Sequence, residues 1–157
     1  PEYARRMVDR LTRRSQQIGS FPQSGRIVPE YQMEQIREVI NTTKRIAVLG
    51  IKTDAQADQP SVYVPQYMQR AGFEIVPVPV YYPEATEILG ERVHRKLTNI
   101  PGDIDMVDVF RRPNDISGHI DDILAKQPKS VWFQSGIRND HAAEIFAKAG
   151  IKVVQDR

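Results

Sequence analysis

In the stretch RIAVLGIKT (residues 45–53), a short apolar run ends in a glycine and a polar loop follows. Residues 61–71 then show a helical pattern that ends before Gly72. This order predicts a buried parallel strand, a turn, and a helix that begins facing the C-terminal end of the strand. Such a turn exposes backbone N–H groups beside the positive end of a helix dipole. It is therefore a suitable site for a phosphate group.

The composition excludes several classes of protein. The 157 residues include no cysteine, so disulfides, thiolate chemistry and cysteine-based metal sites are absent from this chain. No apolar run approaches the ~20 residues of a membrane-spanning helix. Residues 1–43 carry seven basic and five acidic side chains, and residues 44–157 carry fifteen of each. Because no dense basic stripe is present, the composition speaks against a nucleic-acid-binding protein. We expect a soluble, cytoplasmic protein.

From residue 44 onward, apolar segments alternate with helical ones, which predicts a parallel sheet covered on both faces. The expected fold is α/β, a Rossmann-like doubly wound parallel sheet of five or six strands with an N-terminal helical extension. Ligands of such sheets lie outside the strand C-termini where the winding reverses. The expected strands are 46–50, 74–78, 105–110, 130–134 and 151–155, with 91–97 as a further edge strand; the expected helices are 61–71, 114–126 and 139–149.

The N-terminal part is predicted to be a separate appendage. We assign residues 1–28 to a helical arm and linker, and residues 29–157 to the globular domain. Residues 2–17 have an apolar residue at every fourth position among several arginines, which predicts a helix. Residues 29–42 predict a second helix. The arm is interpreted as an exposed or partner-docking helix, with homodimer formation as one use of it; contact with a nucleic-acid backbone is the alternative.

The turn is a poor match to a dinucleotide site. Only Gly50 is present where the dinucleotide fingerprint needs several glycines, and no carboxylate follows the second strand before Glu84. A Walker-type glycine–lysine loop is also absent. What remains is a phosphate turn, an apolar and aromatic shelf, and the cations Lys52, Arg111 and Arg112. These features favour an adenine nucleotide that carries extra phosphate.

Several short motifs follow one another along residues 30–157. They are IAVLG (46–50), QPS (59–61), GFEIVPV (72–78), EILGE (87–91), DMVDVFRRP (105–113), VWFQSG (131–136) and VVQDR (153–157). With these motifs the chain resembles the small stand-alone CoA-binding proteins, which are similar to the CoA-binding domain of the succinyl-CoA synthetase alpha subunit. The resemblance implies a Rossmann-like fold and coenzyme A, or an acyl-CoA, as the ligand.

The resemblance also implies a role for individual residues around the CoA molecule. They are Gly50, Ile51 and Lys52 along the diphosphate, Ser61, Val62 and Tyr63 as donors at the helix start, Pro77 and Val78 beside the adenosine, Phe110, Arg111 and Pro113 on the opposite side of the crevice, and Gln134 and Gly136 toward the pantetheine arm. This chain departs from the family at 79–81, where Pro-Val-Tyr replaces an Asn-Pro-Lys-like run.

Some residues allow two interpretations. Arg111 and Arg112 leave a strand on alternating sides, so we expect one to face the crevice, with Arg111 favoured by the resemblance, and the other to form a surface ion pair. Ser61 is expected to cap its helix, contact phosphate, or do both. If Ser61 is the cap, Pro65 delays the regular helix to Val64.

No catalytic set is recognisable. The three histidines share no metal-ligand spacing and are interpreted as surface or interface residues. Asp108 lies among apolar neighbours, and its expected partner is a backbone N–H or an arginine. Whether the protein is an enzyme stays open, with the absence of a nucleophile and base weighing against it.

Three functions are compatible with these observations. The first is a non-catalytic or accessory protein that binds CoA through its 3′-phospho-ADP moiety. The second is a nucleotide-sensing regulatory module for NAD or another adenine nucleotide, whose basic arm contacts nucleic acid or a partner. The third is a transferase or thioesterase acting on acyl-CoA.

Overall fold

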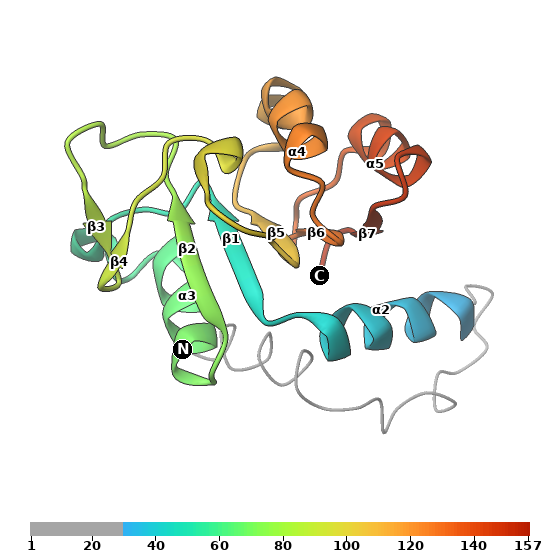
Figure 1. Cartoon of the computed structure of the whole chain (residues 1–157), viewed down its shortest axis with the longest axis horizontal. Helices are drawn as coiled ribbons and strands as arrows, with labels where there is room; N and C mark the ends of the chain where they lie inside the picture. The colour runs from blue at the N-terminus through green and yellow to red at the C-terminus, as the bar shows by residue number, and fades with distance from the viewer. Residues whose placement is uncertain (1–29) are drawn as a thin grey trace.

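A computed structural model describes residues 30–157, which form a five-stranded parallel sheet in the order β2-β1-β5-β6-β7 (Figure 1). The predicted Rossmann-like α/β fold is confirmed. With η for 3-10 helices, the elements are α2 (Glu30–Thr42), β1 (Arg45–Leu49), η1 (Asp54–Gln56), α3 (Pro60–Arg70), β2 (Glu74–Val78), β3 (Glu87–Ile88), β4 (Glu91–Arg92), η2 (Leu97–Asn99), β5 (Met106–Val109), η3 (Pro113–His119), α4 (Ile120–Lys126), β6 (Ser130–Phe133), α5 (Asp140–Lys148) and β7 (Lys152–Val154).

The central strands are buried on both faces, as their apolar runs predict. Alternate residues point to opposite faces. Side chains such as Leu49 and Phe133 pack in one core cluster with α4 and α5, where Phe133 meets Phe146 edge-on with ring centroids 6.4 Å apart. Side chains such as Val48 and Trp132 pack in the other cluster with α2 and α3. The helices therefore cover the two faces in pairs (Figure 1).

The helix after the first strand begins earlier than the sequence suggested. Gln59, not Ser61, occupies the N-cap position, and Pro60 is the first helical residue. The Gln59 carbonyl accepts hydrogen bonds from the backbone of Val62 and Tyr63, which closes the first turn. The prediction that Pro65 delays the helix to Val64 is therefore wrong. Pro65 is buried inside α3, and the helix continues through it because packing on the sheet outweighs one lost hydrogen bond.

The segment between β2 and β5 contains a separate two-stranded hairpin, β3–β4. The expected strand 91–97 is therefore not an edge of the main sheet. The turn of the hairpin is held from two sides: the Leu89 N–H donates to the Asp54 carboxylate at 3.2 Å, and Gln69 Nε2 donates to the Leu89 carbonyl at 3.0 Å. The hairpin is thereby tied to the loop after β1 and to α3.

Of two further helix predictions, one is confirmed in part and the other is confirmed. The segment expected as one helix over 114–126 divides into η3 and α4. Asn139 caps α5 as predicted, because its side chain accepts a hydrogen bond from the Ala142 N–H at 2.9 Å. Gly72 and Gly150, placed at helix ends by the sequence, have φ of 105° and 85°.

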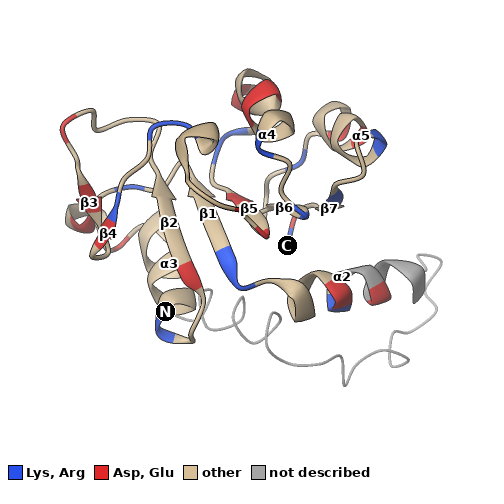
Figure 2. Cartoon of the chain, in the orientation of Figure 1, with Lys and Arg blue, Asp and Glu red and all other residues tan. Residues whose placement is uncertain are grey.

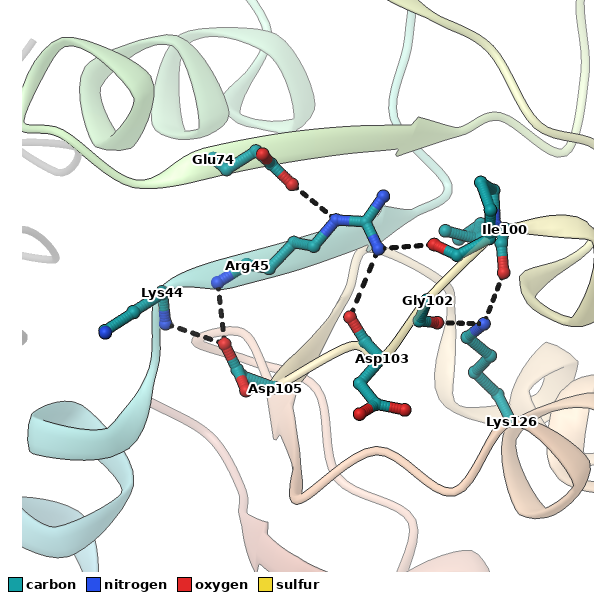
Figure 3. A network of polar contacts seen from close by, with 9 residues as sticks. Lys44, Arg45, Glu74, Ile100, Gly102, Asp103, Asp105 and Lys126 are labelled. Atoms are coloured by element: carbon teal, nitrogen blue, oxygen red, sulfur yellow. Dashed lines mark hydrogen bonds and ion pairs between the residues drawn. The ribbon is translucent and has the colours of Figure 1, made fainter.

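A polar network stabilises the sheet at the N-terminal end of β1, which is opposite the C-terminal ends of the strands (Figure 3). Asp105 accepts 2.9 Å hydrogen bonds from the backbone N–H groups of Lys44 and Arg45. The Arg45 side chain pairs with Glu74 and donates to the carbonyls of Pro101 and Asp103, at 2.6 and 3.2 Å. Burial would raise the pKa of Asp105, but these backbone hydrogen bonds and the contact with Lys129 lower it below its ordinary value.

Charged residues of both signs are distributed over the described elements (Figure 2). None of the helices in residues 30–157 is long and apolar enough to cross a membrane. The predicted arm helix (2–17) and linker lie outside the described residues, and the boundary at residue 28 stays a prediction.

Candidate ligand-binding crevice at the carboxyl ends of the strands

The winding of the sheet reverses between β1 and β5, because β2 lies on one side of β1 and β5 on the other. Gly50 follows β1 at this point, with φ of 90°. A Cβ atom placed on Gly50 would stand 2.3 Å from the carbonyl oxygen of Phe110, the residue after β5. The Gly50 N–H donates to the Val78 carbonyl at the end of β2, at 2.9 Å. The ends of β1, β2 and β5 are thus brought together around one glycine.

The start of α3 supplies polar groups next to this turn. Because Pro60 has no N–H and those of Val62 and Tyr63 donate to Gln59, the backbone donor that the helix start leaves for a ligand is Ser61. Ser61 is 7% exposed. Its position in the first turn places it at the positive end of the helix dipole.

Lys52 is placed beside the same helix start. Its Nζ donates to Gln59 Oε1 at 3.3 Å, and the side chain is partly buried. Among the side chains that the structure describes, no carboxylate forms an ion pair with Lys52. A cation whose partner is a neutral amide is available for an anionic ligand.

Arg111 and Arg112 leave β5 in different directions, as expected. The Arg111 side chain is 14% exposed, and its Cδ would lie 3.2 Å from a Cβ on Gly50. The Arg112 side chain is 83% exposed and forms a surface ion pair with Asp115 at 3.1 Å. Arg111 is therefore the arginine that lies against the turn after β1.

The Arg111 guanidinium has three neighbours. Its Nε donates to His119 Nε2 at 3.2 Å, its Nη2 lies 3.8 Å from Asp115 Oδ2, and its Nη1 lies 3.5 Å from the Tyr81 hydroxyl. Burial, followed by the Arg111 charge, lowers the pKa of His119, which favours the neutral imidazole that this hydrogen bond requires. The hydrogen bond from Arg111 and its charge likewise lower the pKa of Tyr81. His119, expected as a surface or interface residue, is thus a half-buried partner of Arg111.

Several residues assigned to the ligand by resemblance are buried beneath the crevice. Ile51 and Val78 are each 1% exposed, and Pro77 is buried within β2. The carbonyls of Val78 and Pro77 accept hydrogen bonds from the backbone of Gly50 and His94. These residues shape the crevice through the backbone and the core.

Gln134 and Gly136 belong to the loop after β6. Gln134 is 2% exposed, and its amide donates to Oδ1 of Asp108, so the partner of that buried carboxyl is a glutamine side chain and not the backbone N–H or arginine expected. Gly136 donates its N–H to Asp156 Oδ1 at 2.5 Å. This loop is therefore tied to β5 on one side and to the C-terminal residues on the other.

Asp108 is fully buried, and burial raises its pKa to about 7. Its Oδ2 atom has no hydrogen-bond partner in the described part of the chain, nor has the indole nitrogen of Trp132, the neighbouring residue on β6. Pro113 begins η3, and its carbonyl accepts a hydrogen bond from Asn139 Nδ2 at 2.9 Å.

Three residues at this site were not singled out from the sequence. Gln59, Tyr81 and His119 contact Lys52 or Arg111 through side chains that are seven to thirty residues apart in the chain. Of these, only Tyr81 was indicated, because it belongs to the apolar and aromatic shelf noted in the sequence. The contact between Tyr81 and Arg111 depends on the sheet order, which places the loops after β2 and β5 on either side of β1.

Comparison with known sequences is consistent with this geometry. A family described as "CoA binding domain" matches residues 44–157. The chain belongs to this CoA-binding domain family. The resemblance inferred from the short motifs is confirmed, and the matched range includes every residue of the crevice described above.

Individual relatives share most of their length with this CoA-binding domain. The uncharacterized protein YneT of Bacillus subtilis is 35% identical over 122 residues, which cover 78% of this chain and 87% of YneT. A solved structure from Thermus thermophilus, cell-free ID.343, is 36% identical with a TM-score of 0.71, covering 79% of this chain and 90% of that one. A hypothetical protein from Pyrococcus horikoshii OT3 is 30% identical with a TM-score of 0.69. The match covers 79% of this chain and 84% of that protein.

Proposed function

We propose that this protein binds coenzyme A, or an acyl-CoA, through its 3′-phospho-ADP moiety and acts as a non-catalytic or accessory protein. Membership of the CoA-binding domain family supports the ligand class. The observation that carries the proposal is the turn after β1, where Arg111 lies against Gly50 and Lys52 contacts Gln59 at the N-cap of α3, because cations beside a helix N-terminus suit a diphosphate.

The charges around the turn support a phosphate-rich ligand. Lys52 faces the start of α3, and Arg111 lies against Gly50 from the β5 side. Ser61 adds a hydroxyl and an N–H at the positive end of the helix dipole. A charge-assisted hydrogen bond contributes ~1.5–3 kcal/mol, so two or three of them account for micromolar binding when added to apolar contacts.

Isothermal titration calorimetry of the full chain tests the proposal. CoA and acetyl-CoA are expected to bind, while NAD and ATP bind at least about tenfold more weakly. If Lys52 or Arg111 contacts the 3′-phosphate, CoA binds more tightly than 3′-dephospho-CoA. Tighter binding of NAD or ATP than of CoA would instead favour the nucleotide-sensing function, and no binding of CoA would refute the proposal.

A further inference from the structure

Tyr81 is an unusually exposed aromatic side chain. Among the side chains that the structure describes, it is the large apolar one that stays mostly in solvent, at 57% exposure. It stands in the loop after β2, beside the crevice. An aromatic ring in this position gains little for folding, and its exposure leaves a surface on which a flat ligand group can pack.

The backbone that carries Tyr81 is held in place by one arginine. Arg95 donates to the carbonyls of Tyr81, Tyr82 and Ala85, at 3.2, 2.6 and 2.7 Å. Tyr82 has φ of 62°, a conformation that a side chain rarely adopts without such support. The ring is exposed, yet the loop beneath it is fixed.

Arg111 supports the ring from the other side of the crevice. Its guanidinium carbon lies 5.5 Å from the centroid of the Tyr81 ring, within the range of a cation–π contact. Tyr81 follows β2 and Arg111 follows β5, so this contact passes across the end of β1, where Gly50 lies. The phosphate turn, the arginine and the exposed ring are thus neighbours.

From these contacts we infer that the Tyr81 ring is the platform on which the adenine base of the ligand stacks. Arg111 and Arg95 act as positioning residues for the ring. The inference rests on the proposed function, since it assigns the base-reading residue of the same site. Base–aromatic stacking adds affinity with little dependence on the base, so the platform selects a flat heterocycle and leaves specificity to the phosphate contacts.

Two substitutions of similar size separate stacking from packing. Tyr81→Phe keeps the ring, and Tyr81→Leu keeps apolar bulk without it. Stacking predicts that Tyr81→Leu weakens CoA binding by about tenfold, whereas Tyr81→Phe stays within about threefold of the unchanged protein. Thermal unfolding of both variants is expected to match the unchanged protein, because the side chain is exposed.

A spectroscopic signal reports on the base itself. Binding of 1,N6-etheno-CoA at saturating protein is expected to quench the fluorescence of the ethenoadenine ring in the unchanged protein and in Tyr81→Phe, and to leave it substantially brighter in Tyr81→Leu. Equal fluorescence at saturation in all three proteins, or equal affinity of the Leu and Phe variants for CoA, would overturn the inference while leaving CoA binding intact. If the unchanged protein does not bind CoA, the proposed function fails and the inference fails with it.

Discussion

The carbonyl oxygen of Phe110 occupies the position where Gly50 would carry a side chain, 2.3 Å from an ideal Cβ atom. Phe110 in turn donates its N–H to the Leu49 carbonyl at 2.9 Å, so the two loops are locked together by backbone alone. Neither partner can move aside without breaking the junction between β1 and β5. The glycine is required here for close approach as well as for its positive φ.

Replacing Gly50 by alanine is therefore expected to destabilise the protein by about 3 kcal/mol, as the sum of backbone strain and overlap with the Phe110 carbonyl. Gly72→Ala is the matched control, because Gly72 also has positive φ but no atom lies within 4 Å of its Cβ position. Gly72→Ala should lower the free energy of unfolding by about 1–2 kcal/mol. Urea denaturation of both variants measures the difference, and equal losses would mean that the overlap is relieved by a shift of the loop.

The two neighbouring arginines are expected to differ in CoA binding. Arg111→Ala should weaken CoA by about tenfold or more, since it removes a charge-assisted contact next to the phosphate turn. Arg112→Ala removes the same charge from an exposed ion pair and should change affinity by less than about twofold. Calorimetric titration at one salt concentration makes the comparison. Equal weakening by both changes would indicate a long-range effect of net charge instead of a contact.

Asp108 is expected to make stability fall as pH rises. Because burial raises its pKa to about 7, the folded protein keeps a proton between about pH 4 and pH 7 that the unfolded chain has lost. Holding the ionised carboxylate in the core then costs on the order of a few kcal/mol above this window. Asp108→Asn removes the titration while keeping the shape of the side chain.

The measurement is the difference in unfolding free energy between Asp108→Asn and the unchanged protein at pH 5 and at pH 8. Relative to the unchanged protein, Asp108→Asn should be more stable at pH 8 than it is at pH 5. Asp121→Asn, at an exposed position on α4, controls for the loss of a negative charge. A difference that is the same at both pH values would show that Asp108 does not titrate in this window.

Much of the fold could be predicted because its signals are local. Apolar runs such as residues 46–49, and glycines such as Gly72, depend only on neighbouring residues, and they were placed within one or two positions of the observed elements. Two features that depend on packing were missed: the continuation of α3 through Pro65, and the β3–β4 hairpin in place of an edge strand. No local pattern indicates that a proline will be tolerated or which strand a short segment will join.

In the candidate site too, features with a local sequence signal could be predicted, and features that depend on packing could not. Gly50 and the start of α3 could be found from sequence because strand, turn and helix are contiguous. The contact of Arg111 with Tyr81 could not, because it requires knowing that the loops after β2 and β5 face each other across β1. The contact of Arg111 with His119 depends instead on the path of η3, which the sequence analysis predicted as part of a longer helix. The roles assigned to the loop at Gln134 stay predictions.

The network around Arg45 is expected to serve stability alone. Arg45→Ala removes the hydrogen bonds to the carbonyls of Pro101 and Asp103 and the pair with Glu74, and should cost about 1–3 kcal/mol in unfolding free energy. CoA affinity should be unchanged, because the network (Figure 3) surrounds Arg45, the first residue of β1, whereas the candidate site follows Leu49, the last residue of that strand. Weaker CoA binding by a folded Arg45→Ala protein would show that the network at the start of β1 is coupled to the site at the C-terminal ends of the strands.

The central claim is that the turn after β1 and the start of α3 hold the diphosphate of CoA. A crystal structure of the protein grown with saturating CoA tests it most directly. The account predicts diphosphate oxygens within hydrogen-bonding distance of the backbone after Gly50 and of the Ser61 N–H, with Arg111 alongside. CoA bound at any other surface, with this turn left without a phosphate, would contradict it.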